Sequence, residues 1–109
     1  MRWAGSSEYL LDALARLDAL AQNGCHPQEV AATAEMIVVG WWWDARGELT
    51  RDRLVLLVQE LRRWCATAAD AYATRWDHLH RAGRPDQAEE VRRWAIAFYG
   101  VQQTLHRYD

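Results

Sequence analysis

The chain has 109 residues, of which 50% are apolar, and its 13 basic and 15 acidic side chains give a formal net charge of −2. This length suits one domain with a single core over residues 1–109, and the apolar content excludes a disordered chain. The longest apolar run, Met36 to Trp43, is too short to span a bilayer, and the N-terminus shows no secretory leader. We therefore expect a cytoplasmic protein that makes no membrane contact.

Apolar spacing and helix-end signals predict two helices in the first half of the chain. The first runs from a serine cap, Ser6 or Ser7, to Asn23-Gly24, whose residues tolerate the left-handed conformation of a helix end. The second begins at Pro27, a residue suited to the first helical position. Its end is ambiguous, because residues 37–43 also have the composition of a short strand.

The second half of the chain predicts a long helical hairpin. Thr50 caps a third helix whose residues 54–79 keep one face apolar for about seven turns, and Gly83-Arg84-Pro85 ends it. Asp86 and Glu89 have the spacing of a capping box and open the last helix. Apolar residues at spacings of three and four predict a seam along it: Val91, Trp94, Phe98, Val101, Leu105 and Tyr108. A loop this short makes the two helices antiparallel. The expected fold is an all-α antiparallel bundle of four helices, with the long third helix forming a hairpin with the fourth.

Catalytic and metal-binding patterns are missing from this sequence. His78 and His80 lie two residues apart, so they point about 160° away from each other on a helix and cannot share a metal ion. Cys25 and Cys65 form no CxxC pair, and the six glycines make no phosphate-binding loop. We expect no enzyme activity, no metal, no cofactor and no small-molecule substrate.

Three successive tryptophans, Trp41-Trp42-Trp43, form the most informative local feature. Their side chains spread over about 200° of a helix, so one core cannot bury all three from one side. Either neighbouring elements sandwich the segment, or at least one indole, with Trp42 the first choice, faces outward to anchor a partner protein or to stack on a base. On the last helix a second stripe holds Arg92 and the candidate partner-binding residues Ile96, Tyr99 and Gln103, although isolated apolar surface residues are also common.

The basic residues are all arginine, and the arginines are unevenly placed: residues 1–50 carry a charge of −4 and residues 51–109 a charge of +2. The absence of lysine fits selection for arginine, which makes bidentate contacts to phosphate, but codon usage in a GC-rich genome would also explain it. A solvated face of salt-bridged arginines likewise needs no ligand. For contact with RNA or single-stranded DNA, the candidate phosphate-binding residues are Arg51, Arg62, Arg63, Arg92, Arg93 and Arg107.

The helix from Arg51 to Ala82, the tight Gly83-Arg84-Pro85 turn and the closing helix resemble the small helical subunits of class 1 CRISPR effector complexes. The resemblance covers residues 50–109 and is one of architecture without a shared motif, so it carries no functional residue across. It implies a non-catalytic subunit that contacts other protein subunits or copies of itself along a guide-RNA filament, and that helps to hold the guide or target strand.

Two functions follow as hypotheses. The first is a non-catalytic helical subunit of a larger assembly, such as a nucleic-acid-containing complex of the CRISPR type. The second is a small immunity-like or antitoxin-like protein that neutralises one protein partner. The acidic N-terminal half would then face a basic target.

Overall fold

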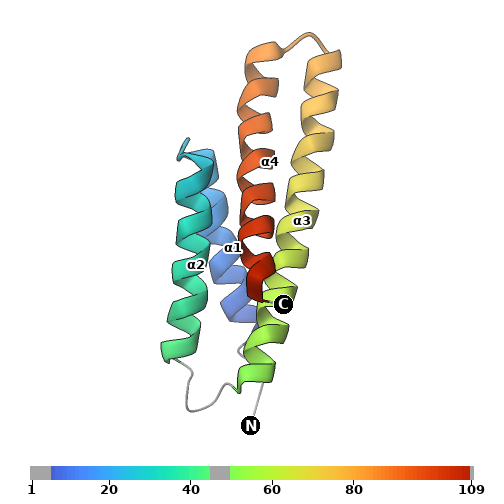
Figure 1. The fold of residues 1–109 in the computed structure, drawn as a ribbon. Helices are drawn as coiled ribbons and strands as arrows, with labels where there is room; N and C mark the ends of the chain where they lie inside the picture. Colours follow the sequence, from blue (N-terminus) through green and yellow to red (C-terminus); the bar gives the residue numbers. More distant parts are fainter. Residues whose placement is uncertain (1–5, 45–49, 109) are drawn as a thin grey trace.

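The computed structural model describes residues 6–44 and 50–108, which form four α helices and a final 3-10 turn (Figure 1). No strand occurs in these two ranges. The all-α prediction is therefore confirmed. The helices and the turn are α1 (Ser6–Gln22), α2 (Pro27–Asp44), α3 (Arg51–Arg81), α4 (Pro85–Leu105) and η1 (His106–Tyr108).

Two glycines end α1 and α3 as predicted. Gly24 and Gly83 have φ values of +83° and +73°, the region that side chains disfavour. At the end of each helix, the amides of the glycine and of the next residue donate hydrogen bonds back to carbonyl groups of the last helical turns. The Gly83 amide donates to the His80 carbonyl at 3.2 Å, and the Arg84 amide donates to Leu79 at 3.0 Å. This pattern satisfies carbonyl groups that the end of a helix leaves without partners.

The start signals of α3 and α4 had different outcomes. Thr50 caps α3, because its side chain accepts a hydrogen bond from the Arg53 amide at 3.2 Å. The capping box predicted for α4 is wrong. Pro85 occupies the first turn, Arg84 is the cap residue without a side-chain cap bond, and Asp86 lies inside the helix. The fixed φ of proline and its missing N–H suit the first helical position, and this placement moves the cap two residues earlier, from Asp86 to Arg84.

The tryptophan segment is helical, which resolves the ambiguity at the end of α2. The helix continues through Gly40 and all three tryptophans to Asp44. Its inner face is buried at Val30, Ala34, Ile37, Val38 and Trp41. Only a helical period brings these positions to one side, so the short-strand alternative is excluded.

Helix α4 lies at the centre of the bundle (Figure 1). It packs along α3 as an antiparallel hairpin, and it packs on α2 more extensively than on α1. Since α2 and α4 both run away from the α3–α4 loop, this second contact joins parallel helices. The predicted seam of α4 forms the middle of the core, with Val91, Phe98, Val101 and Leu105 buried and Trp94 partly buried.

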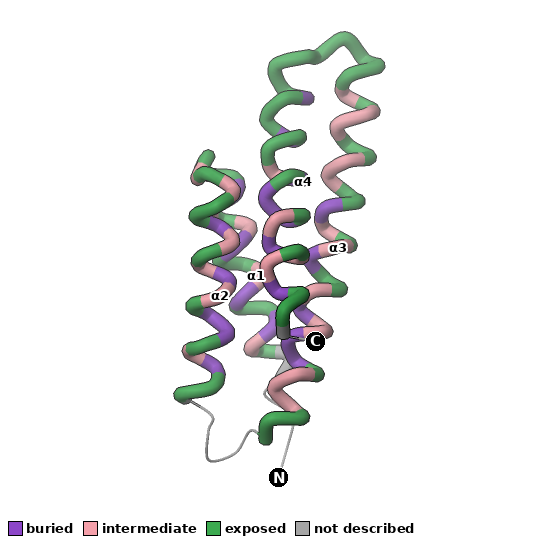
Figure 2. The backbone as a smooth tube through the Cα atoms, viewed as in Figure 1, coloured by how far each residue is buried: buried purple, intermediate pink, exposed green. Residues whose placement is uncertain are grey.

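The tip of the hairpin extends beyond the α1–α2 loop and is largely exposed (Figures 1 and 2). The apolar face predicted for α3 over about seven turns is therefore buried only along part of its length. Ala69 is the last buried residue of α3, and Trp76 and Leu79 are partly exposed. The Trp76 indole is covered instead by the His80 ring, which stacks on it at a centroid distance of 5.5 Å.

Candidate protein-docking surface

Helix α2 carries a second apolar face opposite its buried one. Its members are Met36, Val39, Trp42 and Trp43, with 73%, 47%, 41% and 60% of their surface exposed. We call these four residues the outer α2 face. Met36, Val39 and Trp43 follow one another at spacings of three and four, so they form a continuous ridge on the helix surface. The largest contiguous apolar patch on a small protein is often functional.

The three consecutive tryptophans divide between the two faces. Trp41 is 6% exposed and its indole meets the Tyr9 ring edge-on at 6.1 Å. The prediction that Trp42 faces outward is confirmed, and Trp43 is more exposed than Trp42. With Trp41 inside, the next two positions rotate by about 100° and 200° away from the core.

Sequence reasoning missed three members of this face: Met36, Val39 and Trp43. A signal for them was present. Once Trp41 is assigned to the core, its helical neighbours Ile37 and Val38 join it. The remaining large apolar residues then follow a separate stripe at helical spacing.

The predicted stripe on α4 is exposed. Ile96 and Tyr99 have 40% and 42% of their surface exposed, and Arg92 and Gln103 are also exposed. The Tyr99 hydroxyl donates a hydrogen bond to Asp70 Oδ1 at 3.0 Å, and this bond to a carboxylate raises the pKa of Tyr99. The stripe offers two apolar side chains, which is half the number on the outer α2 face. Its role in docking stays a prediction.

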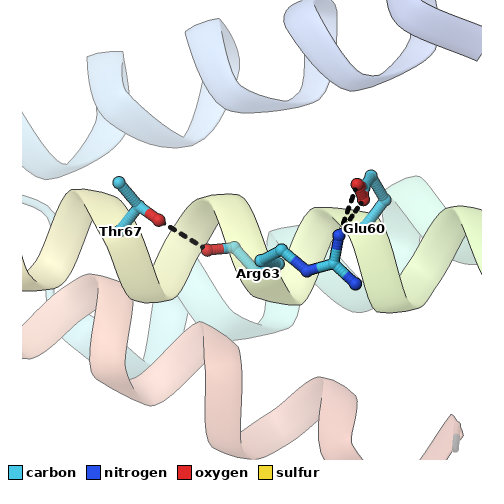
Figure 3. Close-up of polar contacts among 3 residues, drawn as sticks. All are labelled: Glu60, Arg63 and Thr67. Carbon is cyan, nitrogen blue, oxygen red and sulfur yellow. Dashed lines mark hydrogen bonds and ion pairs between the residues drawn. The ribbon is translucent and has the colours of Figure 1, made fainter.

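Most of the candidate phosphate-binding arginines contact other side chains of the chain. Arg63 Nη1 lies 3.0 Å from both Glu60 carboxylate oxygens, and its own carbonyl accepts a hydrogen bond from Thr67 (Figure 3). Arg62 Nη2 lies 2.8 Å from His106 Nδ1. Both guanidinium groups are therefore paired within the chain, although the Arg63 side chain stays 73% exposed.

The other arginines extend the same pattern. Arg92 pairs with Glu89 at 3.2 Å and Arg107 pairs with Glu35 at 3.1 Å, while Arg51 and Arg93 are exposed. The hairpin geometry places the doublet of α4 about 20 Å along the hairpin from the doublet of α3. The six arginines are thus spread over several levels of the molecule, and the structure does not bring them together into one basic face. Strand contact through them stays a prediction.

An apolar groove lies between α1 and α3. It has a volume of about 590 Å³ and contains exposed Leu11 and Trp64, with Phe98 of α4 also in its lining. Asp18 and Tyr72 also line the groove, and the Tyr72 hydroxyl donates a hydrogen bond to Asp18 Oδ1 at 2.5 Å. Burial, reinforced by this hydrogen bond, raises the pKa of Tyr72. The tyrosine therefore stays protonated as the donor.

The two cysteines and the metal-ligand residue types bear on whether the chain has a nucleophilic or metal site. Burial raises the pKa of the Cys65 thiol to about 12, which keeps it protonated and unreactive. Cys25 is a free, partly exposed thiol. Within residues 6–44 and 50–108, no three histidine, cysteine, aspartate or glutamate side chains are grouped to hold a metal ion. No helix in those ranges is long and apolar enough to cross a membrane.

Comparison with known proteins adds no relative. The chain matches no family model, no curated protein and no solved structure.

Proposed function

We propose that this protein is a non-catalytic helical subunit that docks onto a protein partner through the outer α2 face and so joins a larger assembly. The observation that carries the proposal is the exposure of four adjacent large apolar side chains on a helix whose opposite face is buried. Methionine and tryptophan are enriched in the cores of protein interfaces, and tryptophan dominates their hot spots.

The size of the outer α2 face also supports docking. The exposed fractions of Trp42 and Trp43, 41% and 60%, sum to about one whole indole side chain. One such side chain represents roughly 250 Å² of surface, before Met36 and Val39 are added. This amount is suited to the apolar centre of a standard interface, which buries about 800 Å² on each partner.

The proposal is tested by isolating the tagged protein from its native host and measuring its native mass and its absorbance ratio at 260 and 280 nm. The wild type is expected to elute in a complex, and Trp43→Ala is expected to elute as the free 12.7 kDa chain with unchanged helicity. Leu56→Ala is the matched control, because Leu56 is 61% exposed but lies on α3. A Trp43→Ala variant that stays in the complex would overturn the proposal.

The same measurement separates the two kinds of complex. A large particle with a high 260 nm absorbance would identify a ribonucleoprotein assembly of the kind implied by the CRISPR resemblance. A small complex with one other protein would instead favour a module that neutralises a single partner. The acidic charge of residues 6–44, with six acids and one arginine, favours a basic target for such a module.

A further inference from the structure

The border of the outer α2 face includes a carboxylate. Helix α2 contains Glu29 and Glu35 and no basic residue. Glu35 lies four residues before Val39 and seven before Trp42, so it follows the same side of the helix and borders the apolar face. An occupant of this face therefore meets a carboxylate at its edge.

In this structure the Glu35 carboxylate forms an ion pair with an arginine of the same chain. Arg107 reaches from η1 and places Nη2 3.1 Å from Glu35 Oε1. The side chains of Arg107 and Glu35 are 62% and 32% exposed, so water screens the pair. Such exposed ion pairs contribute little to stability, and another cation can replace the arginine at small cost.

We propose that the outer α2 face binds an amphipathic helix of a partner protein, and that an arginine or lysine of this helix replaces Arg107 at Glu35. The inference rests on the docking role proposed above and adds the chemistry of the partner. The ridge of Met36, Val39 and Trp43 has the spacing that packs into the groove of another helix. The acidic border selects a partner whose apolar stripe has basic residues beside it.

A second copy of this chain fits the face less well. Two copies packed through α2 would bring together two helices that contain acidic residues and no basic one, and Arg107 beside each face is already paired with Glu35 of its own chain.

The test uses two fluorescently labelled 18-residue peptides with the same helical stripe of leucines. One carries lysine and the other glutamate at the flanking positions. Binding to the full chain is measured by fluorescence anisotropy at low and high salt. The lysine peptide is expected to bind, and its affinity is expected to fall with salt, whereas the glutamate peptide is expected to bind at least tenfold more weakly.

Three variants and one control locate the contact. Trp43→Ala is expected to weaken binding of the lysine peptide by about tenfold or more. Glu35→Gln is expected to weaken it about two- to fivefold, and Arg107→Gln is expected to strengthen it by a similar factor because Glu35 loses its internal partner. Glu60→Gln is the control, since it removes the same charge from an ion pair on α3, with Arg63 at 3.0 Å, and is expected to change nothing.

Several results would overturn this inference. Equal binding of both peptides would show that the acidic border does not select the partner, while leaving docking through the apolar face intact. Weakening by Arg107→Gln would show that Arg107 does not compete for Glu35. Failure of both peptides to bind, or a dimer of the chain that Trp43→Ala dissociates, would also contradict it. Retention of Trp43→Ala in the native complex would instead contradict the docking role on which the inference rests.

Discussion

The partition of the three tryptophans of α2 leads to a quantitative prediction about stability. Trp41, Trp42 and Trp43 are consecutive and chemically identical, and they differ mainly in exposure, at 6%, 41% and 60%. Replacing each with alanine removes the same atoms from the same helix. The helix propensity term is therefore nearly constant, and the difference in the free energy of unfolding reports burial.

The magnitude follows from the exposed fractions. Trp41 buries about half of an indole side chain more than Trp43 does, because it is 6% rather than 60% exposed. This difference is roughly 130 Å² and corresponds to about 3 kcal/mol at 25 cal/mol per Å². Trp42→Ala should fall between the two, about 2 kcal/mol less costly than Trp41→Ala. Differences between variants avoid most of the uncertainty in the unfolded reference state.

Urea unfolding followed by far-ultraviolet circular dichroism measures this order, since the helical signal does not depend on the tryptophan that is removed. We expect the midpoint to fall most for Trp41→Ala and least for Trp43→Ala. If Trp43→Ala cost as much as Trp41→Ala, the orientation of α2 would be wrong. The outer α2 face would then lose its basis as a docking surface.

Three further predictions concern the core, a cap and two glycines. Between pH 8 and pH 10.5 the wild type should lose about 2 kcal/mol more stability than Cys65→Ala. Folding raises the pKa of the Cys65 thiol from 9.0 to about 12, so the thiol stabilises the fold below pH 9 and this contribution is lost as the pH rises towards 12. Urea midpoints at both pH values check this, and equal losses in the two proteins would contradict it. Thr50→Ala should lower the free energy of unfolding by about 1 kcal/mol and Thr50→Ser by much less, since serine also accepts the hydrogen bond from the Arg53 amide at the start of α3. Equal losses of stability in chemical unfolding would exclude the cap. Gly83→Ala should lower the melting temperature, because a side chain at φ +73° costs about 1 kcal/mol. Gly100→Ala should raise it, because Gly100 lies inside α4 and nothing lies within 4 Å of the new Cβ. A shift of the same sign in both variants would contradict this prediction.

Local signals in the sequence determined the helices and most of their ends. Thr50, Gly24 and Gly83 act through hydrogen bonds and backbone angles within a few residues, so their effects are visible without the rest of the fold. The apolar seam of α4 was readable for the same reason. The wrong capping box at α4 also has a local cause, because Pro85 takes the first helical turn and so places Asp86 inside the helix instead of at its cap.

Tertiary packing decided the features that bear on function. The sequence indicated that at least one tryptophan of α2 faces outward, but only the packing of α2 on its neighbouring helices selected Trp41 as the buried one, with its indole against Tyr9 of α1. The pairing of Glu35 with Arg107 joins residues 72 positions apart, and no local pattern predicts it. The early end of burial along α3 likewise depends on how far α1 and α2 extend. Helix formation is a local property, whereas the exposure of a given side chain depends on which other helices cover it.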